Sequence, residues 1–150
     1  MNVLFVCTGN ICRSPLAAAF LRKKYEEKNI DGLVESAGFS PTTINDPPDP
    51  RAVKAAEKHD LELKGCSRLF VKKDFDKFDK IYVMDTLNFD EVKYLARTKA
   101  DESKIDYAMN VLHPGTNQTV PDPIHSGTID MDSVIDIMDR ITDKITDSTK

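Results

Sequence analysis

A buried strand that runs directly into a helix is the feature that most constrains the fold of this chain. Residues 3–6 read Val-Leu-Phe-Val, a continuous apolar run typical of a strand buried on both faces. Pro15 opens a run of good helix formers that we expect to reach about Asn29, with Ser14 as a plausible N-cap. The residues between this strand and this helix must therefore turn tightly at a helix N-terminus.

Strand and helix signals alternate along the rest of the chain. Later strands are expected at 33–38, 80–84 and 107–111. Later helices are expected from an Asp49 cap to about His59, from Asp85-Thr86 to about Leu95, and from Asp132 onward. This alternation predicts an α/β fold with a parallel sheet, right-handed crossovers and one domain over residues 1–150.

Composition narrows the possible partners. The net charge is −4, which argues against a generic binder of nucleic acid or membrane surfaces. No apolar run is long enough to span a membrane, and the N-terminus does not read as a cleavable signal, so we expect a cytoplasmic protein. The sequence does not determine the oligomeric state, and a monomer is expected. Three cysteines fit a reducing compartment, and three scattered histidines give no metal-ligand spacing, so no metal or cofactor is expected.

Cys7 and Arg13 follow the first strand directly and are separated by five residues. The partial charge of a helix N-terminus and the full charge of Arg13 would both stabilise a reactive thiolate at Cys7. Gly9 tolerates unusual backbone angles, Asn10 suits a left-handed conformation, and the Ser14 hydroxyl can donate to the sulfur. The backbone N–H groups that can turn inward around a tetrahedral oxyanion belong to Thr8, Gly9, Asn10, Ile11, Cys12 and Arg13.

A sulfur nucleophile beside a guanidinium predicts phosphoryl transfer. The planar fork of Arg13 matches two oxygens of a phosphoryl group, which lysine does not reproduce. The leaving group then needs a proton, and Asp122, in the sequence Pro-Asp-Pro, is the best candidate for general acid and base. Parallel sheets bind ligands at the carboxyl ends of their strands, so Asp85, which ends the third predicted strand, should lie near Cys7.

The two other cysteines have less specific interpretations. Cys12 is either a small buried hydrophobic residue or the partner of Cys7 in a reversible disulfide, and the sequence leaves both open. Cys66 is expected to be inert packing.

The segment Cys7–Pro15 reads Cys-Thr-Gly-Asn-Ile-Cys-Arg-Ser-Pro and resembles the N-terminal signature of low-molecular-weight protein tyrosine phosphatases. The resemblance covers nearly the whole chain. It implies a flavodoxin-like three-layer sandwich with a four-stranded parallel sheet in the order 2-1-3-4. Other matching residues, in the family's order, are Ser36–Gly38, Pro48–Arg51, Ser67-Arg68, Asp74-Phe75, Met84-Asp85, Asn88 and Asp122-Pro123.

The resemblance implies a metal-independent phosphatase that acts on phosphotyrosine in proteins and on small aryl phosphates. Cys7 would be the nucleophile, Arg13 the phosphate clamp and Asp122 the acid and base. Cys12 would protect the nucleophile during oxidation by peroxide. Phosphotyrosine proteins would be its substrates, and inorganic phosphate or other oxyanions would bind in the loop. The residues that would hold the loop are Asn10, Ser14, Ser36 and Asp85.

The expected pocket rim departs from the family pattern. Ile124 and His125 stand where many relatives have two aromatic residues, and Thr42 stands where relatives often have Trp or Tyr. Some relatives also have a histidine that bonds to the loop asparagine. Gly65 or Cys66 falls there, so this support must come from elsewhere. Replacement apolar walls could come from Phe39, Ile44 and Ile11.

Three other functions compete with this interpretation. An arsenate reductase of the same fold needs two further cysteines after the third strand, and residues 85–104 contain none. A phosphoarginine phosphatase typically has Thr after the loop asparagine, whereas this chain has Ile11, which favours a flat aromatic ester. A non-enzymatic phosphate reader would lack the nucleophile or the acid, but Cys7 and Asp122 are both present.

Overall fold

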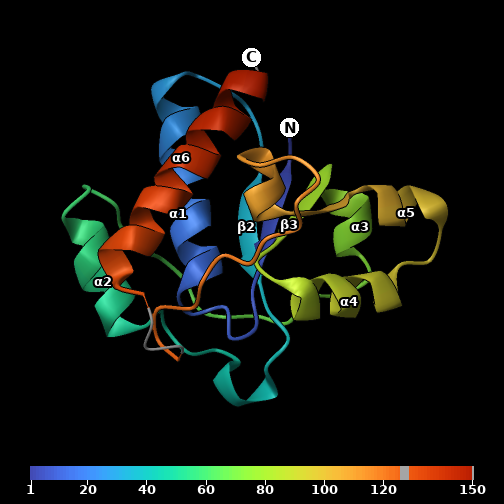
Figure 1. Ribbon diagram of the computed structural model, residues 1–150, viewed down its shortest axis with the longest axis horizontal. Coiled ribbons are helices and arrows are strands. Elements are labelled where there is room, and N and C mark those ends of the chain that lie inside the picture. Colours follow the sequence, from blue (N-terminus) through green and yellow to red (C-terminus); the bar gives the residue numbers. More distant parts are fainter. Residues whose placement is uncertain (126–128, 150) are drawn as a thin grey trace.

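A four-stranded parallel sheet forms the centre of the molecule, as seen in a computed structural model that describes residues 1–125 and 129–149. The strand order is β2-β1-β3-β4, as predicted. Helices cover both faces of the sheet (Figure 1), which confirms the expected three-layer sandwich. The strands are β1 (Val3–Val6), β2 (Val34–Ala37), β3 (Lys80–Val83) and β4 (Ile105–Tyr107).

The helices divide between the two faces of the sheet (Figure 1). One face carries α1 (Arg13–Glu27), α2 (Pro50–Glu57) and α6 (Met131–Thr149). The other carries α3 (Asp74–Lys77), α4 (Thr86–Leu95) and α5 (Lys99–Ser103). Two short 3-10 helices also occur in the described residues, η1 (Pro41–Thr43) and η2 (Ala108–Val111).

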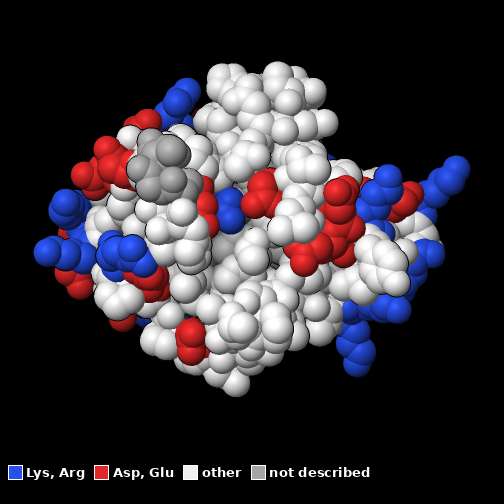
Figure 2. Space-filling view, turned by 60° about the horizontal axis from the view of Figure 1, so that its bottom comes forward, with Lys and Arg blue, Asp and Glu red and all other residues white. Residues whose placement is uncertain are grey.

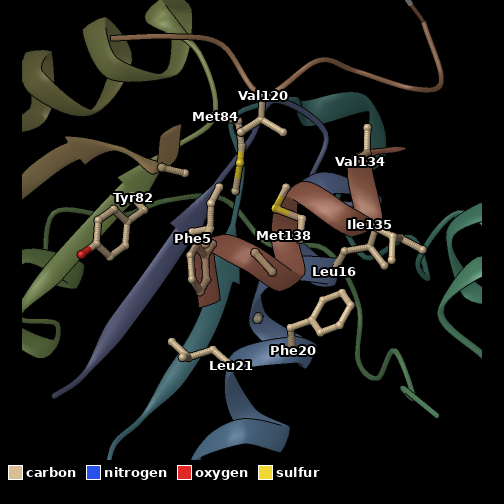
Figure 3. Packing of buried hydrophobic residues seen from close by; sticks show 14 of the residues in the cluster. Phe5, Leu16, Phe20, Leu21, Tyr82, Met84, Val120, Val134, Ile135 and Met138 are labelled. Atoms are coloured by element: carbon tan, nitrogen blue, oxygen red, sulfur yellow. The ribbon is translucent and has the colours of Figure 1, made fainter. Parts of the chain in front are cut away.

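Strand β1 is buried on both faces, as its continuous apolar sequence predicts. Val3 and Phe5 belong to the core cluster beneath α1 and α6, whereas Leu4 and Val6 belong to the cluster on the opposite face. Figure 3 shows the first cluster, in which side chains from β1, α1 and α6 converge. Because both faces are buried, β1 is fixed in position, and so is the loop that follows it.

The apolar stripe of α6 packs into this first cluster. Each large aliphatic side chain removed from water stabilises the fold by roughly 1.5–3 kcal/mol, before entropy costs. The stripe is therefore part of the core and not an exposed surface. Its buried members are Val134, Ile135, Met138, Ile141 and Ile145.

Several boundaries differ from those predicted. β4 begins at Ile105, and residues 108–111 form η2 instead of a strand. The polar Asp106 interrupts the apolar run of β4, which hid the strand in the sequence. The short helices α3 and α5 were not predicted, because a helix of one turn or little more shows no periodicity. The sequence also predicts a long loop over 113–127, because it holds Pro114-Gly115 and Pro121-Asp122-Pro123; residues 126 and 127 of this loop lie outside the described residues.

Helix N-termini follow the predicted capping at two of three places. The Asp49 side chain accepts a hydrogen bond from the Arg51 N–H, and Asp85 accepts one from the Asn88 N–H. Ser14 is not a cap, because α1 already begins at Arg13. The Ser14 side chain is therefore available to contact the loop instead.

The carboxyl ends of β1 and β3 meet at one edge of the sheet, where the strand order reverses. Both chain termini lie at the opposite end of the molecule (Figure 1). Among the described residues, no helix combines the length and apolar character that a membrane span requires.

Candidate active site

The loop after β1 closes around the sulfur of Cys7. The backbone N–H of Cys7 donates to the Ala37 carbonyl at 3.2 Å, which ties the start of the loop to β2. The Cys7 Sγ lies 3.2 Å from the Asn10 N–H and 3.0 Å from the Ser14 Oγ. The sulfur therefore faces hydrogen-bonding groups from the loop and from the first turn of α1.

Asn10 is the central support of this loop. Its φ of 56° is left-handed, as expected, and its side chain is buried. The amide nitrogen donates to the hydroxyls of Ser14 and Ser36, each at 2.8 Å. The amide oxygen accepts the backbone N–H of Arg68 at 3.0 Å. This main-chain contact supplies the support that a histidine provides in some relatives.

Two glycines near the loop have different roles from those suggested by the sequence. Gly9 does not have a positive φ, and a Cβ there would meet its nearest neighbour, Ile11, at an ordinary 3.5 Å. Gly38 is the restrictive position, because a Cβ would lie 2.7 Å from the Thr8 carbonyl oxygen and 2.9 Å from the Asn10 Cβ. Only glycine lets β2 end this close to the loop.

Arg13 is buried at the start of α1 and lines the same hollow as Cys7. Its Nη1 donates to the Val120 carbonyl at 2.9 Å and to the Asp85 carboxylate at 3.3 Å. Asp85 thus lies beside Arg13, as expected from its place after β3. Both contacts use the same nitrogen of the guanidinium. They orient the planar fork from two sides, from the end of β3 and from the loop that contains Val120.

The loop surrounds a hollow of about 550 Å³. Within the described part of the chain, the N–H groups of Thr8, Gly9, Ile11 and Cys12 donate to no other residue. These residues all line the hollow, together with Arg13. A set of backbone donors beside a guanidinium is suited to bind a tetrahedral oxyanion.

Asp122 also lines this hollow. Its Oδ1 accepts the N–H groups of Ile124, at 2.9 Å, and of His125, at 3.3 Å. Its Oδ2 lies 2.8 Å from the His125 Nδ1. Partial burial raises the pKa of Asp122, but hydrogen bonds from His125 and Ile124 and the charge of Arg13 outweigh it. The net pKa is below the ordinary value of a carboxyl.

The rim of the hollow combines polar and aliphatic side chains. Thr42, Ile124 and His125 line it, as does Ile11. Phe39 and Ile44 lie outside this lining, and Phe39 borders a neighbouring groove instead. No aromatic ring is part of the lining among the described residues. The sequence analysis did not identify four further lining residues, which have no distinctive spacing: Ser40, Thr43, Thr119 and Pro121.

The cysteines other than Cys7 have distinct surroundings. Cys12 is buried, and its thiol lies 3.8 Å from the thioether of Met131. Burial, helped by the nearby charge at Cys7, raises the pKa of Cys12 to about 12. Cys66 is exposed, so its predicted role in packing is wrong. All three cysteines are free thiols.

Charged side chains are unevenly distributed around the hollow. Figure 2 shows basic atoms inside it and acidic atoms close on both sides, with a larger acidic cluster on the side of α4. A single buried guanidinium therefore lies within an acidic surface. Such an arrangement concentrates positive potential at the base of the hollow and leaves negative potential at its mouth.

Fold and site together define an α/β protein with a cysteine sulfur at the base of a loop whose backbone N–H groups suit an oxyanion. Residues 2–150 match the family model described as low molecular weight phosphotyrosine protein phosphatase. The human protein of that name is 34% identical over 136 residues, which cover 89% of this chain and 85% of the human one. The Schizosaccharomyces pombe protein of that name is 30% identical, with 85% and 83% covered.

Solved structures agree with this assignment. A protein tyrosine phosphatase from Entamoeba histolytica, with Hepes in its active site, has a TM-score of 0.87 and 30% identity, with 97% of this chain and 94% of that chain covered. A Drosophila arginine phosphatase has a TM-score of 0.90 and 27% identity, with 100% and 98% covered. The chain belongs to the low molecular weight phosphotyrosine protein phosphatase family.

Proposed function

We propose that this protein hydrolyses phosphotyrosine in proteins, and small aryl phosphates, through a phosphocysteine intermediate. One observation carries the proposal. The sulfur of Cys7 lies within hydrogen-bond distance of Asn10 and Ser14 at the base of a hollow that Arg13 also lines. We treat residues 1–150 as one catalytic domain.

In the first step, the Cys7 thiolate attacks phosphorus as the bond to the phenolic oxygen breaks. The phosphoryl oxygens are held by the loop N–H groups and the fork of Arg13, which stabilise the transition-state charge. Asp122, which also lines the hollow, gives its proton to the leaving phenol. The products of this step are phosphocysteine, the free phenol and an ionised Asp122.

In the second step, water attacks the phosphorus of phosphocysteine. The Asp122 carboxylate takes a proton from this water, the bond between sulfur and phosphorus breaks, and Cys7 leaves as a thiolate. Ser14 stabilises that leaving sulfur through its hydroxyl at 3.0 Å. Asn10 and Ser36 are positioning residues, and Asp85 orients Arg13.

Tyrosine is favoured over arginine as the phosphorylated residue by the side chain that follows the loop asparagine. Ile11 lines the hollow, and its branched apolar surface suits the flat face of a phenyl ring. Phosphoarginine remains the second candidate, because the similar Drosophila structure is an arginine phosphatase. Arsenate reduction is disfavoured because residues 85–104 contain no cysteine for the required relay.

We also propose that the protein is cytoplasmic and that peroxide inactivates it reversibly. Three free thiols support a reducing compartment. Peroxide would convert Cys7 to a sulfenic acid, and condensation with the Cys12 thiol would release water and form a disulfide. The raised pKa of Cys12 keeps its thiol protonated, so this closure is expected to be slow.

The experiment that tests the main proposal compares three substrates side by side: an aryl phosphate, a phosphotyrosine peptide and a phosphoarginine peptide. We expect the first two to be turned over with the highest kcat/KM. Cys7→Ser is expected to abolish turnover and to retain binding of vanadate or phosphate. A higher kcat/KM on the phosphoarginine peptide would make phosphoarginine, and not phosphotyrosine, the preferred substrate. Full activity of Cys7→Ser would refute the mechanism.

A second measurement tests the role of Asp122. Asp122→Ala is expected to slow phosphocysteine formation by roughly 10²-fold for phenols of high pKa and much less for good leaving groups. A series of aryl phosphates, with burst kinetics, measures this dependence. Equal losses for good and poor leaving groups would show that Asp122 is not the acid.

A further inference from the structure

A groove beside the hollow runs along the solvent face of α4. It encloses about 400 Å³ and is lined by Phe39, Asp90, Glu91, Tyr94 and Leu95. The walls are mainly apolar carbon, with two carboxylates between them. The mechanism proposed above uses none of these residues.

Four side chains of α4 form one stripe, in which Leu87, Asp90 and Tyr94 are exposed and Glu91 is half-buried. Leu87, Asp90, Glu91 and Tyr94 follow the spacing i, i+3, i+4 and i+7, which places them on the same face of a helix. Leu87 is 59% exposed and Tyr94 is 88% exposed. The stripe therefore has apolar ends and an acidic centre, and its aromatic ring is almost fully in water. Clustered exposed apolar groups of this kind mark interaction surfaces more often than isolated ones do.

The groove is physically joined to the phosphate-binding loop. Asp85 lines the hollow and also caps α4, and the Asn88 side chain donates to the Thr8 hydroxyl at 3.2 Å. On the other wall, the Phe39 N–H donates to the Thr8 carbonyl at 2.9 Å. A chain that leaves the hollow on this side passes directly onto the stripe.

Dimensions and charge indicate the occupant. Leu87 and Tyr94 are seven residues apart, so they span roughly 10 Å of helix. An extended peptide covers that length in about three residues. The acidic atoms on the α4 side of the hollow (Figure 2) favour a cation between the two apolar ends. Lys93, the nearby cation of the same helix, is not part of the groove lining.

We propose that this groove binds the substrate polypeptide next to the phosphorylated tyrosine. It selects an apolar segment that has a lysine or arginine two or three residues from that tyrosine. The proposal rests on the proposed function and adds the sequence context of the substrate. Asp90 and Glu91 bind the cation, and Tyr94 with Phe39 packs against its apolar neighbours. The hollow itself lacks an aromatic wall, so this contact supplies binding that the rim does not.

The test uses phosphotyrosine peptides that differ at one position. One set has lysine two or three residues from phosphotyrosine, on either side, flanked by leucine, and the matched set has glutamate in place of lysine. We expect the wild-type protein to prefer lysine by roughly tenfold in kcat/KM. The double variant Asp90→Asn/Glu91→Gln is expected to remove that preference, and Tyr94→Ala to lower kcat/KM for both peptides by roughly fivefold.

An aryl phosphate, which is too small to reach the groove, separates this proposal from the proposed function. Both variants are expected to keep wild-type kcat/KM on the aryl phosphate. The matched controls are Leu33→Ala, at the other end of the sheet, and Asp136→Asn, on α6. They should leave kcat/KM unchanged both on the aryl phosphate and on the peptides. If the wild-type protein hydrolyses none of these substrates, the proposed function is refuted, and the groove proposal that rests on it is refuted as well.

Two outcomes would overturn the groove proposal while the enzyme remains a phosphatase. One is equal kcat/KM for the lysine and glutamate peptides. The other is a shift in the sedimentation coefficient of Tyr94→Ala relative to the wild-type protein, since that would show a second copy of the chain on this surface.

Discussion

The phosphate-binding loop and the rim around it are built in different ways. The loop from Cys7 to Ser14 is enclosed by the sheet and α1. Asn10 bonds to Ser14 within the loop and connects the loop to two other segments, at Ser36 and Arg68. The rim consists of the segments 40–43 and 121–125, whose side chains are mostly exposed or half-buried. The Ser40 and Thr42 hydroxyls bond to each other at 2.8 Å and face solvent.

This difference separates chemistry from selection. A buried loop with many partners can hold donors within a few tenths of an ångström, which the transition state requires. An exposed rim has few partners and tolerates substitution, so it can change the substrate without moving the reacting atoms. Substitutions of the buried loop residues should therefore affect every substrate equally. Substitutions on the rim, and of Ile11 where the loop faces the hollow, should affect particular substrates or the pH dependence.

The largest effect is expected from Arg13→Lys. Lysine keeps the charge but loses the planar fork, so kcat/KM should fall by roughly 10²- to 10³-fold on every substrate. Steady-state kinetics on the aryl phosphate and both peptides measure this change. Unequal losses among the substrates would contradict the separation between loop and rim. Arg51→Lys is the matched control and should be nearly silent, because Arg51 is exposed, pairs with the nearby Asp49 and lies outside the hollow lining.

An intermediate effect is expected from Asn10→Ala. The change leaves buried groups of Ser14, Ser36 and Arg68 without their partner and places alanine at a positive φ. Unfolding free energy should fall by about 2–4 kcal/mol, and kcat by roughly tenfold or more. Urea denaturation and kinetics on the same samples measure both.

Asn45→Ala is the control for the backbone contribution alone. Asn45 also has a positive φ, of 64°, but its side chain is exposed. We expect a loss of about 1 kcal/mol in stability and no loss of activity. If both variants lose the same stability and activity, the hydrogen-bond network of Asn10 does not hold the loop.

The smallest effect is expected from His125→Phe on the rim. His125 helps to lower the pKa of Asp122, so its loss should raise that pKa. A general acid with a higher pKa keeps its proton to higher pH, and the basic limb of kcat/KM should shift upward. The pH profile of the aryl phosphate measures this shift. His113→Gln is the control, because His113 is an exposed histidine outside the hollow lining. If the basic limb does not move in His125→Phe, that limb reports the titration of a group other than Asp122.

Much of the fold and of the loop could be predicted from the sequence. The apolar run of β1, the alternation of elements and the stripe of α6 are local patterns, and each determines which face of its element is buried. The turn from β1 into α1 brought Cys7, Asn10 and Arg13 together because they are close in the chain. Asp85 was predicted to be near because parallel strands end at the same edge.

The rest depended on contacts between distant segments. The support of Asn10 by the Arg68 main chain, the close packing of Gly38 on the loop, and the exposure of Cys66 have no local pattern. Phe39 was expected at the rim but lies in the groove along α4. Sequence periodicity indicates which side of an element is buried. The neighbours of a loop residue depend instead on where other elements end in space, and only the folded chain determines those positions.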